Sequence, residues 1–214
     1  MFGALYVVED LDAYLTDPQG YLAAHPLPIR DSLLELRRPR KSWKLEELAP
    51  SLAELDKGRS FGNGKQLLQA ASCTACHKVD GVGNELGPDL TKLDVKLGPQ
   101  DILKELLEPS SKIDEKYRAY SFVTASGRVV TGLVVGRTPD AVKVIENALV
   151  SPDPVEIKTS EILEEVKAEA SIMPQGLLDQ LTSVEVLDLL AFLVARGDRN
   201  HAVYKAECGH EPSR

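Results

Sequence analysis

Hydrophobic positions recur at helical spacing in three segments of the chain, residues 60–73, 99–107 and 182–197. In the first segment the apolar and small positions lie three or four residues apart, and Gly64 on that face would let another helix approach closely. Pro99 suits the first turn of the second helix, and Pro109 ends it. The third helix begins at a capping box formed by Thr182 and Glu185. The sequence therefore predicts three amphipathic helices.

Between the second and third helices the pattern changes from helical to alternating. Residues 117–147 read as three strands joined by turns at Ser126-Gly127 and Pro139-Asp140. Residues 154–162 read as a fourth strand after a proline-rich break. Helices that flank a β-rich segment predict an α+β fold.

The two ends of the chain carry weaker patterns. Residues 1–58 read as an N-terminal extension of short elements, and residues 201–214 as a polar tail. The opening run "MFGALYVVEDLDAY" has no basic region before its short apolar stretch, so we expect no signal peptide. No run is long enough for a membrane span. A site that works outside the cytoplasm would then imply a fragment of a longer protein.

Composition narrows the class of protein. Of the 214 residues, 43% are hydrophobic and 27% are charged, which is typical of a globular protein with one or two domains. The formal net charge of −8 argues against binding to nucleic acid, because a phosphate backbone attracts a basic face. An acidic surface still permits docking on a basic partner.

The run "CTACH", residues 73–77, places two cysteines and a histidine within five positions. Cys-x-x-Cys-His is the attachment signature of c-type haem. Two thiols one helical turn apart, those of Cys73 and Cys76, can each add to a vinyl group of the same porphyrin and form a thioether. His77 then lies beneath the iron as the proximal ligand. We therefore expect one covalently attached haem c.

Two other kinds of site use closely spaced cysteines. A structural zinc site needs four nitrogen or sulfur ligands, and Cys208 and His210 in the tail could join Cys73 and Cys76. A redox dithiol is expected in a βαβ context, whereas the pattern here is helical with loops. Haem attachment is the interpretation that accounts for both the cysteine spacing and His77.

A six-coordinate haem needs a second axial ligand. Apart from Met1, the only methionine is Met173, which lies in a short loop before the third helix. Pro174 disfavours helix at Met173 and stiffens the loop. A thioether ligand stabilises the reduced iron and raises the potential, which suits an electron carrier. His25 and His201 are the rival ligands, although both lie where a surface residue is expected.

These segments together resemble a known family. The helix before "CTACH", the "GPDL" loop, the "SIMP" loop and the closing helix "VEVLDLLAFLVARG" resemble a class I cytochrome c. Over residues 59–200 the fuller pattern resembles the Planctomycete/Verrucomicrobium-type haem-binding domain, often found at the C-terminal end of large extracytoplasmic proteins. The resemblance implies a class I helical core around a covalent haem. A small antiparallel β insert, at about residues 117–168, would lie between the second core helix and the methionine loop.

The resemblance also implies roles for single residues. The family's haem-attaching and ligating positions fall on Cys73, Cys76, His77 and Met173. The carbonyl of Pro88 would accept a hydrogen bond from the ring NH of His77, which fixes the ring and tunes the iron. Leu90 would pack on the porphyrin. For the insert, two roles remain open: a docking platform for a partner and a shield for the haem edge.

The first residues carry a second resemblance. "MFGALYVV" resembles the last strand of a cupredoxin, in which a methionine ligand precedes a glycine and an alternating strand. Met1 would then be the copper-ligand position of an upstream domain, or simply a start residue before a strand. The other copper ligands are absent, so this chain alone is not expected to hold copper. The electron partner would be such an adjacent domain or a separate redox protein.

The leading hypothesis is a monohaem c-type cytochrome domain that carries single electrons by Fe(II)/Fe(III) cycling, with His77 and Met173 as axial ligands, in an extracytoplasmic (periplasmic) location. The alternative is a haem enzyme, or a gas or redox sensor, in which the distal site opens. A structural zinc module is the third hypothesis. Cys208 would remain as a thiol that can pair between chains or as an incidental tail residue.

Overall fold

The computed structural model describes residues 41–205. Three longer helices form where the hydrophobic pattern predicts them: α5 (Phe61–Ala70), α6 (Pro99–Leu107) and α7 (Ser183–Val194). Ser60 caps α5 by accepting a hydrogen bond from the backbone N–H of Asn63. The capping box of Thr182 and Glu185 at the start of α7 is confirmed. None of the helices within residues 41–205 is long and apolar enough to cross a membrane.

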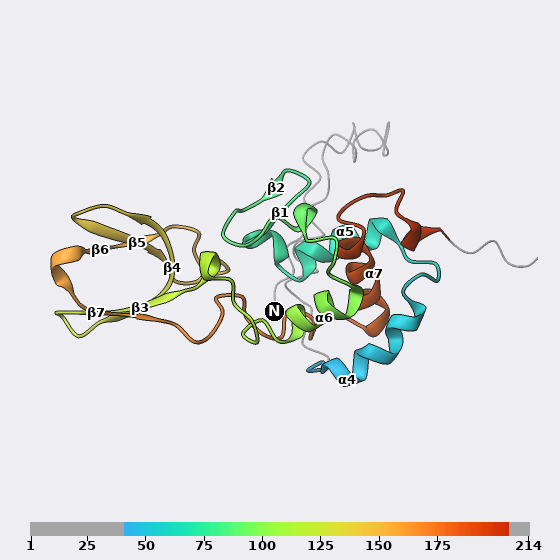
Figure 1. Cartoon of the computed structure of the whole chain (residues 1–214), viewed down its shortest axis with the longest axis horizontal. Helices are drawn as coiled ribbons and strands as arrows, with labels where there is room; N and C mark the ends of the chain where they lie inside the picture. The colour runs from blue at the N-terminus through green and yellow to red at the C-terminus, as the bar shows by residue number, and fades with distance from the viewer. Residues whose placement is uncertain (1–40, 206–214) are drawn as a thin grey trace, which may run out of the picture. The chain divides into compact units, whose positions relative to one another are not determined.

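The helices pack around α7, most of whose residues are buried (Figure 1). Helix α5 crosses α7 at Gly64, where an added Cβ would overlap the backbone oxygen of Asp188 and lie 2.8 Å from the Cβ of Phe192. Helix α6 also contacts α7, and its residues Ile102 and Leu103 are buried. The close approach at Gly64 therefore fixes the central helix pair of the core.

The segment before α5 also packs on this core. Helix α4 (Leu45–Leu48) contacts α6, and the 3-10 helix Ala49–Glu54 contacts α7. The indole nitrogen of Trp43 donates a hydrogen bond to the carbonyl of Leu181, 3.0 Å away. The described part of the predicted N-terminal extension, from residue 41 on, is thus attached to the helices. Met1, His25, Cys208 and His210 lie outside the described residues.

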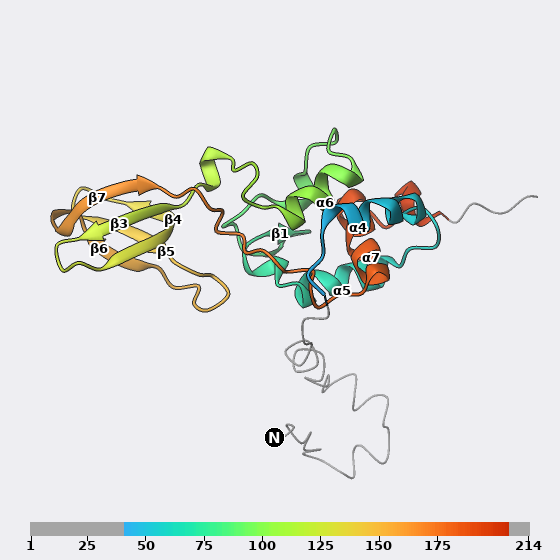
Figure 2. The same cartoon turned by 90° about the horizontal axis from the view of Figure 1, so that it is seen from below.

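Between α6 and α7 the chain forms an antiparallel sheet in the order β6-β5-β4-β3-β7 (Figure 2). Its strands are β3 (Tyr120–Thr124), β4 (Val129–Arg137), β5 (Ala141–Ile145), β6 (Val155–Lys158) and β7 (Ile162–Lys167). Strands β6 and β7 lie at opposite edges, yet only the 3-10 helix Thr159–Glu161 joins them. The sheet must therefore curl until its edges approach each other. Its interior is a separate hydrophobic cluster of Phe122, Val130, Val142, Val144 and Ile157.

The sheet differs in two places from the pattern-based prediction. The predicted fourth strand is interrupted by the 3-10 helix, and a fifth strand, β7, follows it. Only Ile162 of β7 is half-buried and the rest is exposed, so this edge strand lacks the alternation that marks the others. The loop after the cysteines also contains a short hairpin of β1 (Lys78–Val79) and β2 (Val82–Gly83). The described chain is a mixed α+β structure.

Candidate functional site

The cysteine-containing run forms one tight turn at the end of α5. Ser72 adopts a left-handed backbone conformation, with φ of 57°, and the 3-10 helix Cys73–Ala75 follows it. The backbone N–H of His77 donates to the carbonyl of Cys73 over 2.9 Å. Because four residues make about one helical turn, this bond brings Cys73 and His77 to the same side of the turn. Both side chains, together with Cys76, line one crevice.

The loop after the β1–β2 hairpin folds back onto this turn. The N–H of Gly87 donates to the carbonyl of Cys76 over 2.8 Å. A Cβ at Gly87 would lie 2.5 Å from the Cε1 atom of His77, so the backbone passes directly against the imidazole ring. Nδ1 of His77 lies 2.8 Å from the carbonyl oxygen of Pro88. Since a carbonyl only accepts, Nδ1 carries the proton and Nε2 keeps its lone pair.

Burial sets the protonation of these three side chains. It raises the pKa of the Cys73 thiol to about 12 and also raises the pKa of Cys76. Burial lowers the pKa of His77, and the hydrogen bond to the Pro88 carbonyl partly opposes this shift. At neutral pH the turn therefore presents two protonated thiols and a neutral imidazole. A neutral imidazole is the form that binds a metal.

The crevice has a volume of about 380 Å³, within the range of small-molecule and cofactor sites. Six residues singled out from the sequence line it together: Cys73, Cys76, His77, Pro88, Leu90 and Met173. Most of the remaining lining is apolar and comes from the core helices and loops: Leu86, Leu93, Leu97, Ile102, Leu106, Pro109, Ile172, Pro174, Leu177 and Leu193. Met173 lies in the loop before α7, and its N–H donates to Oγ of Ser171 over 3.1 Å.

Several lining residues were not anticipated from the sequence. Ile113, Tyr117 and Leu149 come from the segments that lead into the sheet or join its strands. Leu149 lies in the loop between β5 and β6, where neither spacing nor polarity indicates a contact with the crevice. The contact of Gly87 with the His77 ring was also missed, although the Gly87-Pro88 pair is typical of a tight turn.

The rival ligand in the described part of the chain has a different role. His201 caps the 3-10 helix Ala202–Tyr204, and its Nδ1 accepts a hydrogen bond from the N–H of Val203 over 3.2 Å. It is not among the residues of the described chain that line the crevice. Within residues 41–205, no group of three or more His, Cys, Asp or Glu side chains is placed to hold a metal ion.

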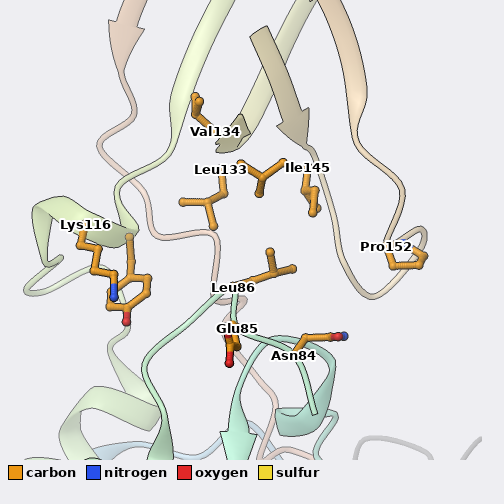
Figure 3. A pocket seen from close by; sticks show the side chains of 10 residues that line it. Asn84, Glu85, Leu86, Lys116, Leu133, Val134, Ile145 and Pro152 are labelled. Carbon is orange, nitrogen blue, oxygen red and sulfur yellow. The ribbon is translucent and has the colours of Figure 1, made fainter. Parts of the chain in front are cut away.

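A second cavity, of about 390 Å³, adjoins the crevice. Leu86 and Tyr117 line both cavities, so they form part of the wall between them. Figure 3 shows Leu133 and Ile145 of the sheet above Leu86, with Pro152 at the side. The second cavity therefore lies where the sheet meets the loop that carries Gly87 and Pro88.

The residues of the first crevice fit a c-type haem. Its walls are apolar, as a porphyrin ring requires, and two thiols and one imidazole with an available Nε2 come from a single turn. Met173 adds a thioether from the loop before α7. Glu105, Lys112 and Asp114 are the charged residues in the lining. This donor set matches the ligand types that proteins use for haem iron.

Comparison with known proteins agrees with this fit. Residues 61–125 match the family model described as Cytochrome c. No curated protein matches the chain. The family match supports a class I cytochrome c-like domain, a haem-binding electron carrier, in this part of the chain.

Proposed function

We propose that the chain is a monohaem c-type cytochrome domain that carries single electrons, with His77 and Met173 as axial ligands. The observation that carries the proposal is the 2.8 Å contact between Nδ1 of His77 and the carbonyl of Pro88, which leaves Nε2 available. Cys73 and Cys76 line the same crevice as His77, and Met173 lines it from a separate loop. Four side chains of the required types therefore converge on one apolar cavity.

The chain's own residues have distinct tasks in this proposal. Cys73 and Cys76 hold the haem covalently, and Pro88 orients the imidazole of His77. Leu90 and the other apolar lining residues exclude water and so influence the reduction potential. When bound, the haem supplies one-electron chemistry at its iron. Met173 stabilises the reduced state and keeps external ligands away from the distal face.

The first test is the absorption spectrum of protein matured in a host that attaches haem c. We expect c-type bands after reduction and a methionine-to-iron charge-transfer band in the oxidised protein. Met173→Ala should abolish the charge-transfer band and leave the haem attached. His201→Ala and His25→Ala, which change the rival ligands, should keep the band.

Two results would contradict parts of the proposal. Extraction of the haem by acid-acetone would exclude covalent attachment through Cys73 and Cys76. C-type bands without the charge-transfer band, in parent protein, would exclude Met173 and favour a sensor or enzyme with an open distal site. A protein that contains zinc and no haem would exclude the proposal as a whole.

We further propose that the domain is of the Planctomycete/Verrucomicrobium type, with an N-terminal extension at residues 1–58, the cytochrome domain at 59–200 and its β insert at about 117–168. The motifs quoted from the sequence and the sheet between α6 and α7 support this proposal. Because this type of domain occurs in extracytoplasmic proteins, we propose that location. A redox protein or an adjacent redox domain, such as a cupredoxin, is the proposed electron partner.

A further inference from the structure

The outgoing segment of the β insert leads directly into the methionine loop. Strand β7 ends at Lys167, and Met173 follows six residues later. Two hydrogen bonds fix this segment: the N–H of Ala168 donates to the carbonyl of Ala119 over 2.9 Å, and the N–H of Ser171 donates to the side-chain Oγ of Ser110 over 3.0 Å. The position of Met173 is therefore tied to the segment by which the chain enters the insert.

Arg118 joins the incoming and outgoing segments of the insert. Its Nε donates to Glu115 over 2.7 Å, its Nη1 to the carbonyl of Ala168 over 3.2 Å, and its Nη2 to the carbonyl of Ile113 over 3.4 Å. The planar guanidinium suits this task because its donors form a rigid fork. Ile113 itself lines the crevice that contains Cys73, Cys76 and His77, called the haem crevice from here on. One side chain thus links the crevice wall to the base of the methionine loop.

A second basic residue completes this arrangement. Lys167 donates to the other carboxylate oxygen of Glu115 over 2.6 Å. The hydrogen bonds from Lys167 and Arg118 hold the pKa of the Glu115 carboxyl below its usual range. Glu115 is therefore ionised at neutral pH and accepts from both ends of the insert. Arg118 is the more sheltered partner, with 21% of its side chain exposed against 62% for Glu115.

We propose that Arg118 is a positioning residue that holds the Met173 loop closed over the distal face of the haem crevice. The inference rests on the proposed function, because it takes Met173 as the distal ligand. An external ligand can reach the iron only after Met173 has moved away. Outward movement of residues 168–173 pulls the carbonyl of Ala168 from Arg118. The bond thus opposes the local opening that admits an external ligand.

Cyanide binding to the oxidised, haem-loaded protein measures this opening. We expect Arg118→Gln to bind cyanide about ten times faster than the parent, which corresponds to about 1.4 kcal/mol in the opening equilibrium. Arg118→Lys keeps a charge near Glu115 but loses the fork, so its rate should lie between the two. The matched control is Arg137→Gln, which removes an exposed bidentate pair between Arg137 of β4 and Glu165 of β7 and should keep the parent rate.

The charge-transfer band gives a second readout that a merely structural role would not move. On heating, Arg118→Gln should lose this band at a lower temperature than the parent, well before the far-ultraviolet circular dichroism changes. Equal cyanide rates for Arg118→Gln, Arg137→Gln and the parent, with the band present in all, would overturn the role of Arg118. That result would leave Met173 ligation unaffected. Absence of the band from the parent would overturn Met173 ligation and this inference together.

A second variant covers the case in which Arg118→Gln does not accumulate as a haem protein. Ser110→Ala removes the acceptor for the N–H of Ser171 and changes one exposed hydroxyl. We expect faster cyanide binding here as well, by a smaller factor than for Arg118→Gln. A parent-like rate in Ser110→Ala, without a folded Arg118→Gln, would overturn the proposal.

Discussion

The imidazole of His77 is oriented by backbone atoms. The carbonyl of Pro88 accepts from Nδ1, and the main chain at Gly87 passes against the ring. Both contacts come from one loop, which is itself held to the cysteine turn by the bond from Gly87 to Cys76. A backbone contact of this kind requires the residue at position 87 to lack a side chain.

Gly87→Ala tests this requirement. The new Cβ would lie 2.5 Å from Cε1 of His77, so the ring or the loop must shift and the bond to Pro88 weakens. We expect a loss of about 1–3 kcal/mol in unfolding free energy and a lower yield of attached haem, measured by denaturant titration and by haem absorbance per protein. Gly62→Ala is the control, because the nearest heavy atom to its Cβ would be Oγ of Ser60 at 4.0 Å. Equal losses in both variants would show that the contact with His77 is unimportant.

At the scale of elements, the crossing of α5 and α7 depends on one glycine. A Cβ at Gly64 would overlap the backbone oxygen of Asp188, which cannot rotate away as a side chain could. Gly64→Ala should lower the unfolding free energy by about 2 kcal/mol, measured by denaturant titration. Gly62→Ala in the same helix is the control, since its nearest neighbour would be 4.0 Å away. A neutral Gly64→Ala would mean that the helices separate at no cost.

The loop between β5 and β6 contributes one side chain to the haem crevice. Leu149 lines the crevice although 44% of it is exposed, whereas its neighbour Val150 is 83% exposed and does not line it. Leu149→Ser should admit water, which stabilises the charged ferric state and lowers the reduction potential by a few tens of millivolts. Potentiometric titration of the haem measures the change. Val150→Ser should keep the parent potential, and an equal shift in both variants would contradict a shielding role.

The elements that the sequence predicts well are those specified locally. The capping box at Thr182 and the prolines around α6 lie within a few residues of the ends that they determine. Strand β7 was missed because its exposed edge position leaves no alternation to detect. In the candidate site, the spacing of the two cysteines and His77 is likewise a local signal that the sequence displays directly. The contacts of Leu149 and of Arg118 depend on the fold, since Arg118 reaches a carbonyl that is 50 positions away.

At the scale of the whole described chain, the sheet and the helices have separate hydrophobic interiors. The sheet closes around its own cluster, centred on Phe122, whereas the helices pack around α7. The chain leaves the helical part near Arg118 and returns at Ala168, and the two ends are hydrogen-bonded to each other through Ala119. The insert is therefore attached at two neighbouring points. Such a unit can be removed without separating the ends that it leaves behind.

Replacement of residues 120–167 by a short glycine-serine turn tests this independence. The turn can bridge the gap because the N–H of Ala168 already lies 2.9 Å from the carbonyl of Ala119. We expect the shortened protein to retain helical circular dichroism and c-type haem bands. Its potential should fall as in Leu149→Ser, since Leu149 is lost with the sheet.

Cyanide binding to the shortened protein separates the sheet from the base of the insert. Arg118 and Ala168 both remain, so the bond between them can still oppose the opening of the Met173 loop. Loss of Lys167 removes one partner of Glu115, and we therefore expect a rate closer to that of the parent than to that of Arg118→Gln. A rate as fast as that of Arg118→Gln would show that the sheet itself holds the loop. In that case the insert, as well as the Arg118 contact, would control access to the distal face.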